Sequence, residues 1–451
     1  MMSLSIKEVL DRQKAFFATQ ETKSLHFRMR TLKKLYQLII DNEEAFYDAL
    51  KKDLYKSRYE AYMTEIGLTL SEITYFLKNL KKLSKIKRVK TPLTQFMAKS
   101  YIYKEPYGVV LIMSPWNYPV LLSLVPLIGA IAAGNCVILK PSETSKNTSN
   151  LLTKLINNNF SSDFITVIEG GVEVSQELLV HKFNYIFFTG SSRVGKIVME
   201  AATKHLTPVT LELGGKSPCI VMRDADLELT AKRIVWGKML NNGQTCVAPD
   251  YILVDENIKD ELIEKLIKYI KLFSNDRAHF INEAALTRMQ SLLDKQKIIY
   301  GGKVEKDKLQ MDFTLVDEAS LDSRLMQEEI FGPILPVLSF TKLDDVIAII
   351  NKNKEPLALY LFTKTKEIKD YILKSLVFGG GCINDTIVHL STAYLPFGGV
   401  GISGMGHYHG KASFDTFTHD KSIIERLYGF DLKAKYPPFS KSLKLLKKVL
   451  K

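Results

Sequence analysis

Between residues 107 and 213, short apolar runs alternate with longer segments whose apolar residues recur every three or four positions. The short runs have the length of buried strands, and the longer segments have the length of helices. Parallel strands need crossover helices, and they are apolar throughout when both faces of their sheet are covered. The pattern therefore predicts an α/β fold with a mostly parallel sheet, which binds ligands beyond the carboxyl ends of its strands. The expected strands are 107–113, 136–139, 165–168, 185–188 and 209–213, and the expected helices lie near 119–133, 144–158, 173–181 and 193–204.

Two further regions flank this alternation. Helical spacing dominates residues 5–90, so helices are expected to open the chain. A second α/β stretch runs from about residue 224 to 395 and ends in a glycine-dense loop at 397–406. So many glycines predict tight turns or close approach of the backbone. Strand-like runs in this second stretch are 251–254, 334–340 and 357–362.

The cysteines and the first residues bear on the compartment. Cys136, Cys219, Cys246 and Cys382 lie far apart, with no CxxC pair or Cys/His cluster. We therefore expect no disulfide framework and no metal site, and the cytoplasm is the expected location. Charged residues interrupt the start of the chain before a signal-peptide core forms, and no uncharged apolar run of about 18 residues occurs. Secretion and membrane spanning are not expected.

The charge balance is basic, with 62 Lys and Arg against 49 Asp and Glu, a net charge of +13. Much of the excess falls in residues 78–90 and in the tail after Asp431. In that tail Leu443, Leu446 and Leu450 recur at helical spacing, which predicts a short basic amphipathic helix. Such a helix either packs on a subunit or makes weak peripheral contact with an anionic membrane. Neither stretch has the pattern of an RNA-binding sheet or a zinc finger, so nucleic acid is not an expected partner.

Two expected strand ends carry residues suited to a nucleotide. The fourth strand leads into Gly190, Ser191 and Gly195, where a glycine turn opens a helix and presents backbone N–H groups to a pyrophosphate. The second strand is followed by Lys140 and Glu143, which can bind ribose hydroxyls. Considered separately, a glycine at this position is more often only a turn, and a Lys/Glu pair is more often a surface ion pair.

Three other residues have catalytic potential. Cys246 lies in a polar segment expected to be flexible, whereas the other three cysteines adjoin apolar residues that indicate core positions. Glu212 lies inside an apolar strand, where burial raises the pKa of a carboxyl toward that of a useful base. Asn117 follows the first strand between two prolines and offers an amide donor for an oxyanion. The alternatives are an inert loop cysteine, a buried glutamate paired with a cation and a turn asparagine.

Taken together, six motifs resemble the ordered signature set of aldehyde dehydrogenases, and the chain near residues 403–419 is similar to the class 3 branch. The motifs are PWNYP (115–119), KPSE (140–143), FTGS (188–191), LELGGK (211–216), GQTC (243–246) and EEIFGP (328–333). The resemblance implies an NAD(P)-binding domain at 1–82 and 104–211 and a catalytic domain at 212–413. It further implies an oligomerisation element at 83–103 and 414–430, a basic C-terminal tail at 431–451 and a homodimer.

The resemblance also implies roles for these residues. Cys246 would attack the aldehyde, and the Asn117 side chain with the Cys246 backbone N–H would hold the oxyanion of the thiohemiacetal. Glu212 is the preferred base for hydrolysis of the thioester, although Glu329 is an alternative. The residues implied at the cofactor are Glu329 and Phe331 at the nicotinamide ribose, Lys140 and Glu143 at the adenine ribose, and Gly190, Ser191 and Gly195 at the pyrophosphate.

The expected activity is oxidation of an aldehyde to the carboxylate with NAD, with NADP also accepted. Trp116 and Tyr118 indicate an aromatic wall near the nucleophile, which favours medium-chain aliphatic or aromatic aldehydes. One alternative is a thiol hydrolase that uses Cys246 with a histidine. Another is a catalytically idle structural or lipid-surface protein, which the joint presence of Cys246, Glu212 and Asn117 disfavours.

Overall fold

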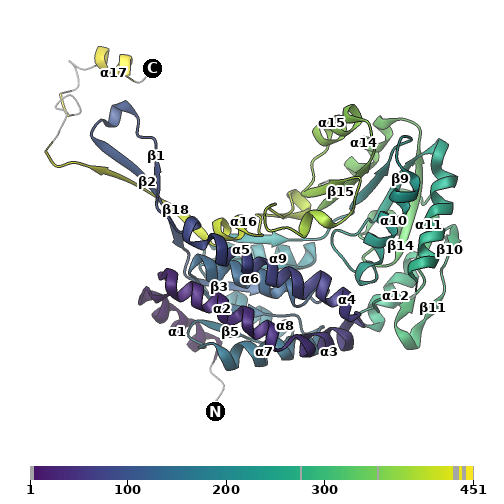
Figure 1. The fold of residues 1–451 in the computed structure, drawn as a ribbon, viewed down its shortest axis with the longest axis horizontal. Coiled ribbons are helices and arrows are strands. Elements are labelled where there is room, and N and C mark those ends of the chain that lie inside the picture. Colours follow the sequence, from purple (N-terminus) through teal and green to yellow (C-terminus); the bar gives the residue numbers. More distant parts are fainter. Residues whose placement is uncertain (1–4, 275–276, 353–354, 430–435, 439–442, 450–451) are drawn as a thin grey trace.

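The computed structural model describes residues 5–274, 277–352, 355–429, 436–438 and 443–449. Within these residues the chain forms two lobes, each built on a sheet, and an arm that projects from the first lobe (Figure 1). The first sheet has six strands in the order β17-β7-β6-β3-β4-β5. They are β17 (Gly404–Met405), β7 (Val209–Glu212), β6 (Tyr185–Thr189), β3 (Val109–Met113), β4 (Cys136–Lys140) and β5 (Ile165–Val167).

The first sheet is parallel except for β17, as its apolar strands predict. Its central strand β3 is buried throughout and pairs with β4 on one side and β6 on the other. The crossover helices agree with the expected ones to within about two residues, an ordinary uncertainty for helix ends. They are α6 (Leu121–Ala133), α7 (Lys146–Asn159), α8 (Val172–Val180) and α9 (Ser192–Thr203). Ligand sites are therefore expected where β3, β4, β6 and β7 end.

Helices open the chain and pack on this sheet, but they end at Leu83 rather than near residue 90. A single π-helical turn, Tyr62–Ile66, interrupts them between α4 and α5. Beyond Leu83 the backbone becomes extended and enters the arm. The opening helices are α1 (Ile6–Ala18), α2 (Leu25–Asp41), α3 (Glu43–Leu54), α4 (Arg58–Ala61) and α5 (Gly67–Leu83).

The second sheet has seven strands in the order β10-β13-β14-β9-β8-β15-β16 and is parallel except for β10. It starts with β8, earlier than the expected start of the second stretch near residue 224. Its strands are β8 (Pro218–Val221), β9 (Tyr251–Asp255), β10 (Ile298–Tyr300), β13 (Thr314–Asp317), β14 (Ile334–Phe340), β15 (Ala358–Phe362) and β16 (Gly380–Ile383). The helices of this lobe are α10 (Leu227–Met239), α11 (Lys259–Phe273), α12 (Glu283–Leu292), α13 (Arg324–Gln327), α14 (Leu343–Lys352) and α15 (Lys366–Ser375). A small hairpin joins β11 (Val304–Glu305) and β12 (Gln310–Met311).

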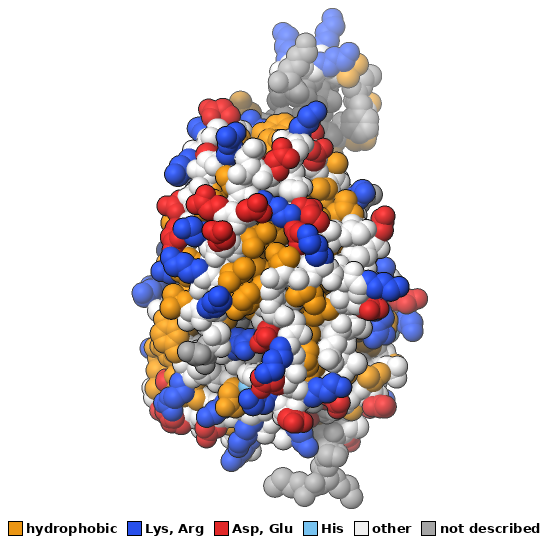
Figure 2. Space-filling model, turned by 90° about the vertical axis from the view of Figure 1, so that its right-hand side faces the viewer, with side chains coloured by type: hydrophobic (Ala, Val, Ile, Leu, Met, Phe, Trp, Pro, Cys, Tyr) orange, Lys and Arg blue, Asp and Glu red, His pale blue; other side chains and the backbone are white. Residues whose placement is uncertain are grey.

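The arm is a three-stranded antiparallel sheet of β1 (Lys87–Val89), β2 (Ala98–Pro106) and β18 (Thr418–Arg426), with β2 in the centre. The last helices are α16 (Lys411–Thr416), which leads into β18, and α17 (Leu443–Val449) near the tip of the arm (Figure 1). The expected tail helix is therefore present at 443–449, whereas Leu450 lies outside the described residues. In the described part of the chain, no helix is both long and apolar enough to cross a membrane. On the face turned to the viewer in Figure 2, basic and acidic side chains are interspersed.

Candidate functional site

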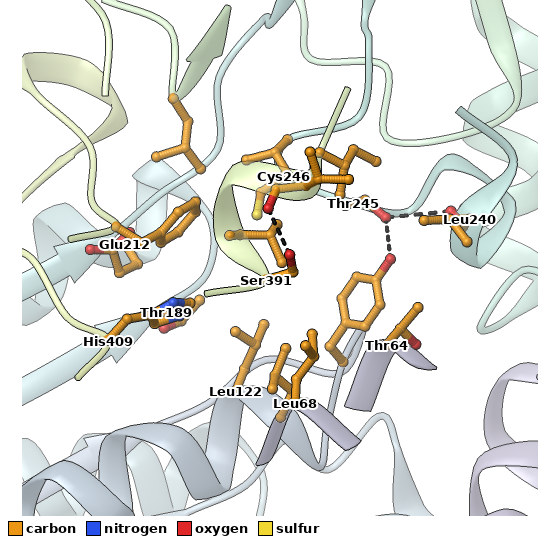
Figure 3. A pocket seen from close by; sticks show the side chains of 18 of the residues that line it. Thr64, Leu68, Leu122, Thr189, Glu212, Leu240, Thr245, Cys246, Ser391 and His409 are labelled. Carbon is orange, nitrogen blue, oxygen red and sulfur yellow. Dashed lines mark hydrogen bonds between the residues drawn. The ribbon is translucent and has the colours of Figure 1, made fainter. Parts of the chain in front are cut away.

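Two cavities meet at Cys246. One has a volume of about 110 Å³, and the surface that lines it is mostly apolar. The other has a volume of about 350 Å³ and opens toward the start of α9. Both cavities are lined by Cys246 and Glu212, so these two side chains lie at the junction. Figure 3 shows them in the wall of the first cavity. We call the first the substrate cavity and the second the cofactor cavity, and the paragraphs below give the reasons.

The loop that carries Cys246 is buried and tightly hydrogen-bonded, so the expectation of a flexible segment was wrong. Asn241 and Asn242 adopt left-handed backbone conformations with φ of 51° and 55°, which asparagine tolerates better than most residues. The Gln244 side chain donates to the carbonyl oxygens of Asn241 (3.0 Å) and His279 (2.9 Å). These contacts fix the backbone just before Cys246, whose side chain is partly exposed to the cavities.

Two of the three expected core cysteines, Cys136 and Cys219, are buried. Cys382 is partly exposed instead, because β16 is an edge strand of the second sheet. It nevertheless does not line the substrate or the cofactor cavity. Cys246 is therefore the cysteine that both cavities share.

Glu212 ends β7 and is 2% exposed. Neither of its carboxyl oxygens has a hydrogen-bond partner, so the alternative of a glutamate paired with a cation was wrong. Burial alone raises the pKa of Glu212 well above its ordinary value. An unsatisfied carboxyl with a raised pKa at the junction of two cavities has the surroundings of a general base, which accepts a proton in its ionised form.

Glu329 is a second buried carboxyl in the cofactor cavity. Burial and then the charge of Asp250 raise its pKa to about 8. A Cβ atom at position 214 would lie 2.1 Å from Glu329 Oε2, so only a glycine leaves room for this carboxyl. Beside it, the rings of Phe331 and Trp116 meet edge to face with centroids 5.6 Å apart.

The surroundings of Cys246 raise the pKa of its thiol to about 12. Burial is the largest cause, followed by the negative charges of Glu329 and Glu212. Burial favours the protonated form of both carboxyls, and protonation of either one removes a charge that opposes the thiolate. Ionisation of Cys246 is therefore easiest while both carboxyls remain neutral.

Asn117 lies beside Cys246 in the turn that follows β3 and is buried. Its amide nitrogen donates one hydrogen bond to the Gln244 carbonyl oxygen at 3.1 Å. An amide has a second N–H, which is available to an oxygen at the cavity junction. The next residue, Tyr118, bonds the Thr245 hydroxyl at 2.6 Å, which joins this turn to the cysteine loop a second time.

The residues of the cofactor cavity fit a nicotinamide dinucleotide. Gly190 and Ser191 line it at the start of α9, where backbone N–H groups favour an anion. Glu329 Oε1 is buried without a partner, and a ribose hydroxyl would satisfy it. Phe331 and Trp116 offer flat apolar rings. Trp116 therefore faces the cofactor cavity and not the substrate wall on which it was expected.

Three expected cofactor residues lie outside this cavity. A Cβ atom on Gly195 would lie 2.6 Å from Leu213 Cδ2, so Gly195 lets α9 pack closely on the chain after β7. Lys140 and Glu143 form an ion pair of 2.6 Å beyond the end of β4. Burial acts to raise the pKa of Glu143, but the Lys140 ammonium outweighs it and holds that pKa below its usual value.

The substrate cavity has walls that the sequence did not reveal. Met63, Leu68, Trp236, Val388 and Phe397 line it, with Tyr118 from the expected wall. His409 also lines it, and its ring stacks on that of Phe397 with centroids 5.6 Å apart (Figure 3). Burial lowers the pKa of His409 to about 4, so this imidazole is neutral. These residues come from distant parts of the chain and carry no local pattern that marks a pocket.

Known proteins share this architecture and these motifs. The model of the aldehyde dehydrogenase family matches residues 4–423. The 4,4'-diaponeurosporen-aldehyde dehydrogenase of Staphylococcus aureus is 49% identical over 447 residues, which are 97% of each chain. The dimeric NADP-preferring aldehyde dehydrogenase of Canis lupus familiaris is 44% identical over 443 residues, covering 96% of this chain and 98% of its own. Aldehyde dehydrogenase family 3 member A2 of Mus musculus is 43% identical over 445 residues, covering 97% and 92%.

A solved structure extends the likeness to three dimensions. The substrate-bound state of Staphylococcus aureus AldH superposes with a TM-score of 0.97 at 48% identity and covers 100% of both chains. The expected aldehyde dehydrogenase fold and the resemblance to the class 3 branch are thereby confirmed. These matches do not favour a thiol hydrolase or an idle scaffold. The chain belongs to the aldehyde dehydrogenase family.

Proposed function

We propose that this protein oxidises apolar aldehydes to carboxylates with NAD as the preferred cofactor, and that Cys246 is the nucleophile. The observation that carries the proposal is the meeting, at Cys246 and Glu212, of an apolar cavity and a second cavity lined by Gly190, Ser191 and Glu329. An aldehyde reaches the thiol from one side, and a hydride acceptor reaches the same carbon from the other. The S. aureus and dog relatives, both named as aldehyde dehydrogenases, support this reading.

The first chemical step belongs to Cys246. Its thiolate Sγ bonds to the aldehyde carbon, and the carbonyl electron pair moves to the oxygen. The free N–H of the Asn117 amide and the Cys246 backbone N–H then donate to that oxyanion. A nicotinamide dinucleotide, when bound in the cofactor cavity, supplies the acceptor for the hydride. Gly190 and Ser191 hold its pyrophosphate end.

The second step is hydrolysis of the resulting thioester. Glu212 takes a proton from water, and the oxygen of that water bonds to the thioester carbon. The carbon–sulfur bond breaks, which releases the carboxylate and returns the sulfur of Cys246 as thiolate. Glu212 suits this task because its carboxyl oxygens are unbonded and face the junction. Glu329 and Phe331 hold the nicotinamide ribose.

Cofactor choice depends on Lys140 and Glu143, which we place at the adenine ribose. The Glu143 carboxylate accepts from ribose hydroxyls and repels a 2′-phosphate, so NAD is preferred. The Lys140 ammonium, already 2.6 Å from Glu143, offsets part of that repulsion and lets NADP bind. The dog relative is named NADP-preferring, which supports acceptance of both.

The substrate class follows from the walls of the substrate cavity. Met63, Trp236 and Leu240 line this cavity and also line a neighbouring groove of about 320 Å³. Leu272 and Tyr59, which are 64% and 76% exposed, form the outer part of that groove. An apolar tail can therefore extend from the thiol toward the surface. We place medium-chain aliphatic and aromatic aldehydes in the inner cavity, and the groove has room for longer apolar tails.

Assembly and location complete the proposal. We assign 1–82 and 104–211 to the cofactor domain, 212–413 to the catalytic domain, and 83–103 with 414–430 to an oligomerisation arm that builds a homodimer. A relative named as dimeric supports this assembly. The four unpaired cysteines support a cytoplasmic location. The basic tail at 431–451 makes weak contact with anionic membranes.

The test is a single turnover with NAD and a panel of aldehydes, followed by absorbance of the reduced cofactor. The wild type is expected to give one rapid equivalent for each active site and then steady turnover. Cys246→Ala is expected to give none, because no covalent adduct forms. Cys382→Ala is the matched control, since Cys382 is also partly exposed but lines neither cavity. Reduced cofactor from Cys246→Ala, or acid formation without NAD, would contradict the proposal.

A further inference from the structure

A buried ion pair lies behind the oxyanion turn. Lys56 Nζ and Glu65 Oε1 are 2.6 Å apart, and both side chains are completely shielded from solvent. Neither side chain lines the substrate or the cofactor cavity. Burying two charges is unfavourable unless other polar contacts compensate for the lost water. The remaining contacts of this pair all lead to the turn that carries Asn117.

Lys56 holds that turn directly. Its ammonium donates to the Asn117 carbonyl oxygen at 3.2 Å and lies 3.9 Å from the centre of the Tyr118 ring. The same carbonyl oxygen accepts a second hydrogen bond, at 2.7 Å, from the Asn241 side chain. The backbone of Asn117 is thus fixed between a buried cation and the loop that precedes Cys246.

Glu65 holds the other end of the turn. Its second oxygen accepts from the backbone N–H groups of Val120 at 2.8 Å and Leu121 at 3.3 Å. These groups start α6, whose residues are all buried and whose N-cap residue gives no side-chain bond. Buried N–H groups at a helix start need an acceptor, and a carboxylate is the most favourable one. Glu65 therefore caps α6 from a different helix.

The π-helical turn Tyr62–Ile66 explains how one short segment does this. A π turn contains an extra residue, is rare, and occurs mostly at functional sites. Here Met63 and Thr64 line the substrate cavity (Figure 3), while the adjacent Glu65 faces the buried ammonium. The π turn therefore contributes side chains to the wall of the substrate cavity and, at its next residue, a charge to the turn that carries Asn117.

We propose that the Lys56–Glu65 pair is a positioning unit that sets the Asn117 amide and the start of α6 for oxyanion binding. The inference rests on the proposed function, because it assigns the pair to the step that Asn117 assists. Lys56 and Glu65 do not touch the substrate. They act by fixing the Asn117 backbone on both sides, which holds its side-chain amide in the wall of the cofactor cavity beside Cys246.

The test is a double-mutant cycle on the rate of the first hydride transfer. Lys56→Met/Glu65→Gln removes both charges, keeps similar volumes and leaves an amide oxygen as a cap, so no buried charge is left unpaired. We expect the burst of reduced cofactor to slow by roughly 10²–10³-fold, the loss typical of one oxyanion donor. Asn117→Ala is expected to slow it to a similar extent. The triple variant is expected to be little slower than the pair variant or Asn117→Ala alone, because both changes remove the same interaction with the oxyanion.

Several readouts separate positioning from general damage. NAD affinity and the rate of Cys246 alkylation by iodoacetamide are expected to be unchanged, since neither needs the oxyanion. Arg58→Gln/Glu44→Gln removes an exposed ion pair between α4 and α3 and is expected to leave the burst intact. If the Lys56→Met/Glu65→Gln protein does not fold, Glu65→Asp replaces it in the double-mutant cycle. This substitution retains the charge, but its shorter side chain moves the carboxylate away from the start of α6.

A normal burst rate in the Lys56/Glu65 variants would overturn the inference. So would a triple variant whose loss in burst rate equals the product of the losses of the pair variant and of Asn117→Ala. Those outcomes are distinct from failure of the proposed function. If Asn117→Ala itself shows a normal burst, the oxyanion assignment fails whatever the pair does. If Asn117→Ala is slow and the pair variants are normal, only the positioning role fails.

Discussion

At the scale of single residues, two buried carboxyls lie near Cys246, and their different surroundings suit them to different roles. Glu212 is held by no hydrogen bond, whereas Glu329 accepts a hydrogen bond from the backbone of Gly215 and shares the cofactor cavity with Phe331. A general base has to turn toward a water molecule, so a carboxyl without hydrogen bonds suits this role. A group that orients a ribose has to stay in place, so a carboxyl held by its neighbours suits that role. This contrast is the physical reason to assign hydrolysis to Glu212.

Glu212→Gln is therefore expected to form the thioester and then stall. One equivalent of reduced cofactor should appear for each active site, followed by turnover slowed by roughly 10²–10⁴-fold, as is typical for loss of a general base. Rapid mixing with NAD and a good aldehyde measures both phases. Glu329→Gln is the matched control and should keep steady turnover at saturating NAD. The opposite result in the two variants would assign the base to Glu329.

Cofactor preference is tested at Glu143. Glu143→Gln removes the carboxylate that repels a 2′-phosphate and leaves the Lys140 ammonium without its partner. The ratio of kcat/KM with NADP to that with NAD is expected to rise by roughly tenfold, the effect of about 1.4 kcal/mol. Steady-state kinetics with both cofactors measure this ratio. A wild-type enzyme that clearly favours NADP would show the assignment to be wrong.

At the scale of elements, α5 is tied to the loop before α16 through one carboxyl. Glu72 on α5 accepts from the Gly410 N–H at 2.6 Å, next to His409 in the substrate wall. Burial raises the pKa of Glu72 to about 7. Since the folded pKa lies above the unfolded value, the neutral carboxyl favours the folded state fully below about pH 4.5. That contribution is lost as the pH rises through 7.

The free energy of unfolding is therefore expected to fall by roughly 3 kcal/mol between pH 4.5 and 7.5 through this one group, at about 1.4 kcal/mol for each pH unit. Glu72→Gln should lack this component and gain stability relative to the wild type as the pH rises. Urea denaturation at several pH values measures the difference. The exposed Glu177→Gln on α8 serves as the control. Parallel pH profiles for the Glu72 variant and the wild type would contradict the pKa shift.

Some helices and strands of this protein could be predicted from the sequence, and others could not. The strands and helices of the first sheet were predictable because each is apolar or amphipathic within its own length. The π-helical turn at 62–66 and the buried Lys56 were not, because nothing local distinguishes a buried lysine from an exposed one. The motifs around Cys246, Glu212 and Asn117 were recognisable, whereas walls such as Val388 and His409 depend on which distant loops meet. Those contacts exist only in the folded chain.

At the scale of the whole molecule, the arm presents apolar side chains to solvent. Ile423, Ile424 and Leu427 are exposed, and β18 is an edge strand of the arm. An exposed apolar edge strand favours pairing with another chain. Ile424→Lys is expected to weaken the proposed homodimer at least tenfold, which sedimentation velocity over a dilution series measures. Val180→Lys, which changes an exposed apolar residue on α8, should have no effect. An unchanged dimer in Ile424→Lys would place the interface elsewhere.

The tail is tested separately on membranes. Lys444, Lys447 and Lys448 lie on α17, which is exposed at these positions. Attraction of about 1 kcal/mol for each basic residue near an anionic surface permits weak binding. Co-sedimentation with phosphatidylserine vesicles is expected for the full chain at low salt and to be lost when residues 431–451 are deleted. Equal binding by both proteins would show that the tail does not contribute.

The return of β17 and β18 to the first lobe has a consequence for biosynthesis. The second sheet is drawn entirely from residues 218–383, so a ribosome has delivered all of it before residue 404 is made. β7, which carries Glu212, must wait for β17, and β2 must wait for β18. A nascent chain thus exposes an incomplete sheet edge at β7 until residues 404–405 have been made. Glu212 therefore reaches its final surroundings only after residues 404–405 have joined the first lobe.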